Sequence, residues 1–396
     1  MIISGTGAPL RTILIFILFG AIAACSDSSD GVSLGVQISA DAPDTLGSFG
    51  VGHNTFTAID SLRNNRSLAI DVWYPVDAPD RQDSPLTTYA LAPGIGLDST
   101  IAVDDLPVSA RTSQTLLIYS HGLGGISTAS VRLMETLASH GFIIISPEHT
   151  GNSQNSNNQS FDEAARSRVP DVSFLIDTMV QRSQVEGDMF HRRIDADNVG
   201  VIGHSFGGMT ALGMAAGWAG ASPDKRVKAI VPISAVIRAE LQKDDRSGEP
   251  NAGFSKQQLE QITVPTLLIG GTQDIDVFIE NNTIAFMEII NSPFTYQLDL
   301  RGANHNHFIA VCDIGNLLIS LGINQDSWPA IGAEGLLEPY ASTCSPQAFP
   351  IEEVDRLLNI YAVAFFRRHL QGDARYNFWL SPEFAANETN ATLTAK

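Results

Sequence analysis

The chain has 396 residues, of which 44% are hydrophobic and 17% are charged, and its formal net charge is −19 with a sequence pI near 4.7. This composition is typical of a globular protein, and the length is sufficient for one large α/β domain with insertions. The strong negative charge disfavours nucleic acids and anionic membrane surfaces as electrostatic partners.

The first residues have the pattern of an export signal. Arg11 precedes an apolar run over residues 12–24 that is too short to span a bilayer, and the run ends at Cys25. We predict a signal peptide over residues 1–24. The end of the run resembles a bacterial lipobox, which implies lipidation of Cys25, a polar tether over residues 25–46 and attachment to the outer membrane, on its periplasmic or surface face. A plain signal peptide and a secreted or periplasmic protein is the alternative.

Strand-like and helix-like runs alternate along most of the remaining chain, as in a doubly wound, mostly parallel sheet. The runs with strand character are residues 68–74, 116–120, 142–146, 199–202, 227–233, 266–269 and 295–300, and those with helix character are 131–139, 172–180 and 352–370. We therefore predict one α/β domain over residues 47–380, followed by a C-terminal tail at 381–396.

Two segments do not fit this alternation. Residues 151–168 are rich in Asn, Ser and Gln, and residues 306–350 contain an apolar stretch together with Cys312 and Cys344. We expect both segments to lie over the carboxyl ends of the strands, the second as a lid, although packing without contact to a substrate is the alternative. In an exported chain the two cysteines are predicted to form a disulfide, with two buried free thiols as the alternative.

One motif predicts a nucleophile. Residues 203–207 read Gly-His-Ser-Phe-Gly at the end of a buried strand, and a helix of small residues follows. Glycines on both sides allow so sharp a turn that the hydroxyl of Ser205 becomes exposed at the helix N-terminus. We predict that Ser205 is a nucleophile, the alternative being an ordinary Gly-rich turn.

A nucleophilic serine requires a histidine that accepts its proton and a carboxylate that holds the histidine. In a doubly wound fold with such a serine turn, the three residues follow along the chain in the order serine, acid, histidine and lie at the carboxyl edge of the sheet. Asp274 and His305 each follow a predicted strand and fit this order, whereas Asp276 and His307 are the alternatives. Asp276 heads the next predicted helix, where an N-cap role is expected.

The histidines near residue 305 do not form a metal motif. The Asn-His-Asn-His run has no carboxylate or further histidine at ligand spacing, so we expect neither a metal nor a cofactor. His204, inside the serine motif, is expected to be a packing residue.

The loop after the strand at 116–120 predicts an oxyanion hole. Residues 119–125 read Tyr-Ser-His-Gly-Leu-Gly-Gly and precede a helix. We predict that the backbone N–H groups of Leu123 and Phe206 are the donors. His121 would orient the loop, and Gly122 and Gly124 would free its backbone. A flexible glycine turn is the alternative.

Together these motifs resemble the α/β-hydrolase superfamily, and more narrowly the group of platelet-activating-factor acetylhydrolases, dienelactone-hydrolase-like proteins and cutinase-like polyester hydrolases. The resemblance covers roughly residues 65–380. The segments on which it rests are residues 71–75, 120–125, 137–142, 147–149, 168–177, 203–208 and 301–308. It implies a sheet of about eight strands with a lid-like insertion, and a serine carboxylic-ester hydrolase that forms an acyl-enzyme. Short-acyl esters and acetylated phospholipid-like lipids are the implied substrates.

The chain also departs from each of these families. The acetylhydrolases place their acid after the strand that follows the nucleophile, but residues 231–239 contain no carboxylate, and Asp274 matches the cutinase-like placement. Dienelactone hydrolases have cysteine where Ser205 stands, and the insertion at 306–350 is foreign to the compact cutinase-like enzymes. A polyester hydrolase or lipase is therefore an alternative, as is a non-catalytic binding lipoprotein on the same scaffold. A membrane contact is expected only through the N-terminal anchor, and the oligomeric state is open.

Overall fold

The computed structural model describes residues 42–77, 84–111 and 114–396. The predicted signal peptide and the predicted lipidation site at Cys25 lie outside the described residues. Across these three ranges, no helix is both long and apolar enough to cross a membrane.

The described residues form a sheet of eleven strands in the order β13-β12-β11-β10-β9-β5-β6-β2-β1-β4-β3. The bounds are β1 Gly50–Asp60, β2 Arg66–Val76, β3 Leu86–Ala92, β4 Ile95–Asp104, β5 Gln114–Ser120, β6 Ile143–Pro147, β9 Ile194–His204, β10 Val227–Ile233, β11 Thr266–Gly271, β12 Thr295–Leu300 and β13 Ala391–Ala395. A separate small hairpin joins β7 Asn152–Ser153 to β8 Ser156–Asn157.

The centre of the sheet is parallel, from β6 through β5, β9, β10 and β11 to β12. This confirms the predicted doubly wound, mostly parallel fold. The sheet is wider than the eight strands we expected, because the β3–β4 hairpin and β13 add strands at its two edges. Residues 381–396 are therefore not a tail outside the fold, since β13 pairs antiparallel with β12.

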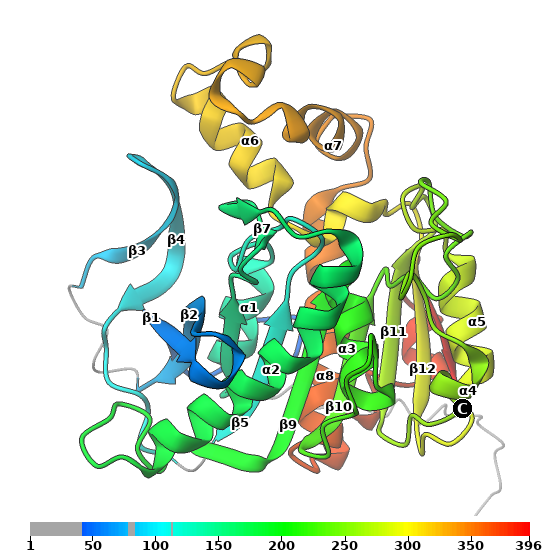
Figure 1. The fold of residues 1–396 in the computed structure, drawn as a ribbon, viewed down its shortest axis with the longest axis horizontal. Coiled ribbons are helices and arrows are strands. Elements are labelled where there is room, and N and C mark those ends of the chain that lie inside the picture. The colour runs from blue at the N-terminus through cyan, green and yellow to red at the C-terminus, as the bar shows by residue number, and fades with distance from the viewer. Residues whose placement is uncertain (1–41, 78–83, 112–113) are drawn as a thin grey trace, which may run out of the picture. The chain divides into compact units, whose positions relative to one another are not determined.

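Helices cover both faces of the sheet (Figure 1). Their bounds are α1 Val131–Ser139, α2 Phe161–Gln184, α3 Phe206–Ala216, α4 Lys256–Leu259, α5 Glu280–Glu288, α6 Val311–Ser320, α7 Leu337–Thr343, α8 Ile351–His369 and α9 Pro382–Ala385. Successive strand side chains point to opposite faces, so Leu116 and Ile118 of β5 join the core under α2 and α3, whereas Leu117 and Tyr119 join the core under α1 and α8.

Helix α2 begins earlier than the sequence pattern indicated. Its N-cap Ser160 and Glu163 form a capping box, and the helix continues through Pro170. Residues 161–168, which we expected to belong to an excursion from the sheet, are instead the first turns of α2. This difference places Arg168 on a buried helix face.

Residues 311–343 form a helical insertion made of α6, α7 and the short 3-10 turns between them. Figure 1 shows this insertion at the top of the view, beyond the carboxyl ends of the strands. A disulfide joins Cys312, in the first turn of α6, to Cys344, directly after α7, with their Cα atoms 5.5 Å apart. Inside the insertion, Trp328 is fully buried and packs its ring edge-on against Tyr340.

Candidate active site

Ser205 occupies the turn between β9 and α3. Its backbone has φ 57° and ψ −119°, which is strained for a residue with a side chain, and its N–H donates to Ile233 O at 2.8 Å. The glycines of the motif allow close backbone approach: a Cβ on Gly207 would lie 1.8 Å from Ser120 O, and one on Gly203 would lie 2.2 Å from Gly207 O. The local structure is therefore the sharp strand-to-helix turn that exposes a nucleophilic serine.

Asp274 and His305 form a pair at the carboxyl edge of the sheet. Asp274 follows β11, and His305 opens a short 3-10 turn after β12. His305 Nδ1–H donates to Asp274 Oδ2 at 2.8 Å, while Asp274 Oδ1 accepts the N–H groups of Asp276 and Val277 at 3.0 and 2.8 Å. The carboxylate is thus fixed from both sides, and the pairing leaves Nε2 of His305 available as a base.

Ser205 and His305 line one cavity of about 150 Å³ together with Leu123 and Phe206. No hydrogen bond joins Ser205 Oγ to His305 within the described ranges. Such hydrogen bonds are often long without a substrate and shorten when one binds. The four residues predicted as nucleophile, base and oxyanion donors therefore line the same cavity, and their roles stay predictions.

The alternative residues have other partners. Asp276 faces Lys243 at 3.5 Å on the wall of the same cavity. His307 accepts the N–H of Asn304 at Nδ1 and donates from Nε2 to Phe349 O, and burial lowers its pKa. His204 donates to His305 O at 3.0 Å, and its ring packs 4.5 Å from the His305 ring, in keeping with a packing role.

The predicted oxyanion loop lies against the serine turn. A Cβ on Gly122 would lie 3.5 Å from Ser205 Cβ, and Gly124 has φ 66°. His121 is fully buried and donates from Nδ1 to Gly122 O at 2.7 Å, so it contacts the loop that we predicted it would orient. Leu123 follows directly and lines the cavity, and the residue is 45% exposed.

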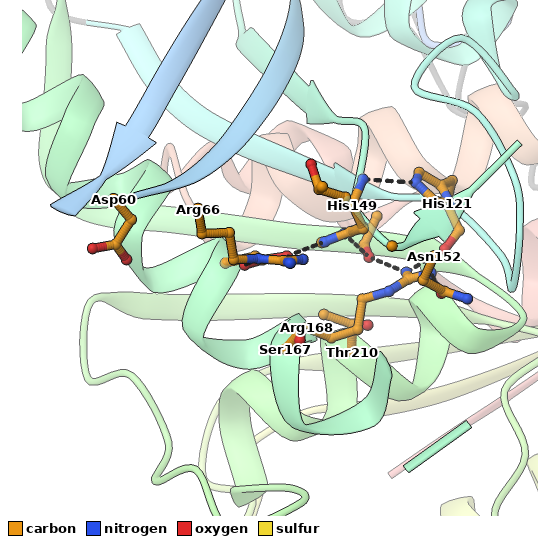
Figure 2. Close-up of polar contacts among 12 residues, drawn as sticks. Asp60, Arg66, His121, His149, Asn152, Ser167, Arg168 and Thr210 are labelled. Carbon is orange, nitrogen blue, oxygen red and sulfur yellow. Dashed lines mark hydrogen bonds and ion pairs between the residues drawn. The ribbon is translucent and has the colours of Figure 1, made fainter. Parts of the chain in front are cut away.

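A buried polar cluster beneath this loop was missed by the sequence analysis (Figure 2). Its centre is Asp171, which accepts hydrogen bonds from Arg66, Arg63 and His149. Burial alone would raise the pKa of Asp171, but the hydrogen bonds from Arg66 and His149 outweigh it and hold the pKa well below its usual range. The Arg168-x-x-Asp171 spacing, which puts both side chains on one helix face, was the available signal.

His149 connects this cluster to the loop. Its Nδ1–H donates to Asp171 at 2.9 Å, its Nε2 accepts from the Ser120 hydroxyl at 3.0 Å, and its backbone N–H donates to His121 Nε2. Burial, followed by the nearby charge of Arg168, lowers the pKa of His149 to about 3. The imidazole is therefore neutral in the folded protein at all but strongly acidic pH.

We expect this neutral histidine to make the protein acid-labile. In the unfolded chain His149 binds a proton near pH 6.5, whereas the folded protein binds it only near pH 3. The free energy of unfolding should therefore fall as the pH drops below about 6.5, with His149 contributing up to about 1.4 kcal/mol per pH unit. Urea unfolding of the wild type and of His149→Gln between pH 7.5 and 4.5 measures this, and equal slopes for the two proteins would contradict it.

No side-chain cluster for a metal is found: among the described residues, His, Cys, Asp and Glu side chains do not gather in a group that could hold an ion. The mostly parallel sheet and the sharp strand-to-helix turn at Ser205 are features of the α/β-hydrolase fold. Residues 115–247 match the family model described as alpha/beta hydrolase fold. The chain thus has the α/β-hydrolase fold.

Two curated proteins are similar to parts of this chain. "Cutinase est2" of Thermobifida alba is 29% identical over 190 aligned positions, which cover 48% of this chain and 52% of that protein. "Platelet-activating factor acetylhydrolase" of Bos taurus is 28% identical over 136 aligned positions, covering 24% of this chain and 31% of that protein. The chain therefore spans about half of the first relative and about a third of the second. Both names fall in the group that the sequence motifs resemble.

Proposed function

We propose that this protein is a serine carboxylic-ester hydrolase in which Ser205, His305 and Asp274 form the catalytic triad. The observation that carries the proposal is the 2.8 Å hydrogen bond between His305 and Asp274. His305 lines the same cavity as Ser205, whose backbone is strained. The names of the cutinase and acetylhydrolase relatives also point to ester hydrolysis.

The reaction would begin with acylation of Ser205. His305 Nε2 takes the hydroxyl proton as Oγ attacks the ester carbonyl, and Asp274 holds the imidazole in the tautomer that leaves Nε2 free. The N–H groups of Leu123 and Phe206 would stabilise the oxyanion of the tetrahedral intermediate. His305 then gives its proton to the departing alcohol. In the second half, His305 activates a water that releases the acid and restores Ser205.

Leu123 lines two cavities, and we propose that the acyl group and the alcohol group of an ester occupy different ones. The smaller one, of about 150 Å³, lies on the Ser205 side and is lined by apolar side chains such as Phe161 and Met209 and by charged ones such as Lys243 and Asp276. We propose that it takes the acyl group, which its size limits to short chains. The larger one, of about 370 Å³, lies between the oxyanion loop and the helical insertion and would take part of the alcohol.

A polyester hydrolase or lipase is the second candidate. The larger cavity is lined by apolar side chains such as Ile309, Ile314 and Leu336, and it opens between the site and the insertion. If the acyl group entered this space instead, long chains or a polymer segment would fit.

Export remains part of the proposal. Lipidation at Cys25 would anchor the enzyme to an outer membrane, and a plain signal peptide would leave it secreted or periplasmic. Growth of a producing cell with labelled palmitate, for the wild type and Cys25→Ala, distinguishes these two outcomes, because only lipidation makes the label depend on Cys25.

A labelling and rate experiment tests the proposed activity. A fluorophosphonate is expected to modify the protein at one residue, which peptide mass mapping should identify as Ser205. Rates are then measured on p-nitrophenyl esters from acetate to palmitate, on an acetylated ether phospholipid and on an amorphous polyester film.

The chain-length profile separates the candidates. A steep fall in kcat/KM beyond butyrate supports a short-acyl esterase, whereas activity that persists to palmitate or on the film supports the lipase or polyester candidate. Failure of the probe to label Ser205, with no turnover of any ester, would instead favour a non-catalytic binding protein on this scaffold.

A further inference from the structure

Arg168 lies beneath the oxyanion loop and is fully buried (Figure 2). Its Nη1 donates to His121 O at 2.6 Å and to the Ser120 hydroxyl at 3.1 Å. Its Nη2 donates to Gly122 O at 3.0 Å and to the side-chain oxygen of Asn152. Within the part of the chain that the structure describes, no carboxylate pairs with this guanidinium. Two of these four hydrogen bonds go to consecutive backbone carbonyls of the loop.

These contacts determine which way the next peptide N–H points. Gly122 O receives three donors: Arg168 Nη2, the Nδ1–H of His121 at 2.7 Å and the backbone N–H of Gly125 at 3.2 Å. In a planar trans peptide the C=O and the following N–H point in opposite directions. A Gly122 carbonyl held toward Arg168 therefore turns the Leu123 N–H away from Arg168. Hydrogen bonding at the carbonyl also polarises the peptide and strengthens its N–H as a donor.

Arg168 also contacts the second predicted donor residue. Its Cζ atom lies 4.8 Å from the centroid of the Phe206 ring, a cation–π contact that supports the first residue of α3. One side chain thus touches both chain segments whose N–H groups must converge on the same oxygen.

We propose that Arg168 is the positioning residue of the oxyanion hole, a role that rests on the proposed function. It acts through the Gly122–Leu123 peptide on one side and through the Phe206 ring on the other. The guanidinium itself does not touch the substrate. Its planar fork suits this task, because two donors at fixed spacing can hold two consecutive carbonyls, whereas an ammonium group is a single point.

The cluster around Asp171 makes a buried guanidinium tolerable. Asp171 lies one turn further along α2, and its negative charge opposes the positive charge of Arg168. Desolvation lowers the pKa of Arg168 to about 9, so the group stays protonated at neutral pH. Loss of the guanidinium would leave the carbonyls of His121 and Gly122 with fewer donors in a buried place, and the loop would relax toward other partners.

The test compares Arg168→Lys and Arg168→Gln with the wild type on p-nitrophenyl butyrate. Removal of one oxyanion donor typically lowers kcat by about 10²–10³-fold. We expect a loss of this size for Arg168→Gln and a smaller loss for Arg168→Lys, both with KM nearly unchanged. The Ki of a trifluoromethyl ketone, which forms a tetrahedral oxyanion on the serine, should rise by the same factor as kcat/KM falls. The Ki of the product butyrate should not change.

Arg66→Lys is the matched control, since Arg66 binds Asp171 in the same cluster but does not contact the loop carbonyls. It should lower the thermal midpoint without changing kcat or the Ki of the ketone. If Arg168→Gln does not fold, Asn152→Ala removes only one acceptor that aligns the guanidinium, and it should show the same paired change in kcat and Ki on a smaller scale.

The outcomes are distinguishable. Unchanged kcat and Ki in folded Arg168 variants, or changes confined to KM and the thermal midpoint, would overturn the positioning role while leaving the esterase proposal intact. A wild type without ester turnover, or turnover that does not depend on Ser205, would overturn the proposed function and this inference with it.

Discussion

Replacement of Ser205 by alanine is expected to lower kcat for p-nitrophenyl butyrate by about 10⁶-fold, because no acyl-enzyme can form. The remaining activity would come from water attacking a bound ester whose oxyanion is still stabilised by the N–H groups of Leu123 and Phe206. Initial rates at saturating substrate measure the loss. Labelling by a fluorophosphonate should disappear in the same variant.

Ser234 provides the control for this substitution. It follows β10, also has a positive φ, of 45°, and is buried with a hydroxyl that has no hydrogen-bond partner among the described residues. Ser234→Ala removes a hydroxyl from the end of the strand next to β9 and should change kcat by only a few-fold. Comparable losses in the two variants would mean that the effect comes from packing, and retention of substantial turnover by Ser205→Ala would refute the nucleophile assignment.

The second large effect is expected for Asp274→Asn, which should lower kcat by about 10⁴-fold. The Asn Oδ1 can still accept the N–H groups of Asp276 and Val277, so the turn is retained. Its amide nitrogen would then face His305 Nδ1, and two donors cannot share one hydrogen bond. The imidazole would move its proton to Nε2 and could no longer accept the proton of Ser205.

Asp276→Asn is the matched control, because Asp276 stands two residues away and lies on the cavity wall beside Lys243. We expect this variant to keep kcat within a few-fold of the wild type. Rate profiles from pH 5 to 10 for both variants measure the difference. A larger loss in Asp276→Asn than in Asp274→Asn would assign the carboxylate role to Asp276.

The placement of Ser205, Asp274 and His305 at one edge of the fold could be predicted because each residue follows a buried strand. The carboxyl ends of parallel strands meet at one edge of a sheet, so strand order along the chain is enough to bring such residues near each other. The same reasoning placed the loop around Leu123 beside Ser205. It preferred Asp274 and His305 over Asp276 and His307 on position alone. In the structure His305 forms a hydrogen bond with Asp274, and the catalytic roles of both residues stay a prediction.

The support beneath the loop could not be predicted in the same way. The spacing of Arg168 and Asp171 indicates a shared helix face, but not which backbone carbonyls that face meets. We predicted helix character only over residues 172–180, whereas the capping box at Ser160 starts the helix at Phe161. The edge strands were missed for a related reason: β13 is short and only alternate residues are buried, so its pattern resembles that of an exposed tail.

The disulfide at the base of the insertion has a consequence for how substrate preference could diverge. The disulfide between Cys312 and Cys344 holds their Cα atoms 5.5 Å apart. It therefore fixes the distance between the two ends of residues 313–343, where the insertion joins the rest of the protein. The chain between the cysteines can therefore change in sequence or length without displacing His305, which lies outside the closed loop. The insertion is in this sense an exchangeable module: mutation there can reshape the wall of the larger cavity while the reacting groups keep their geometry.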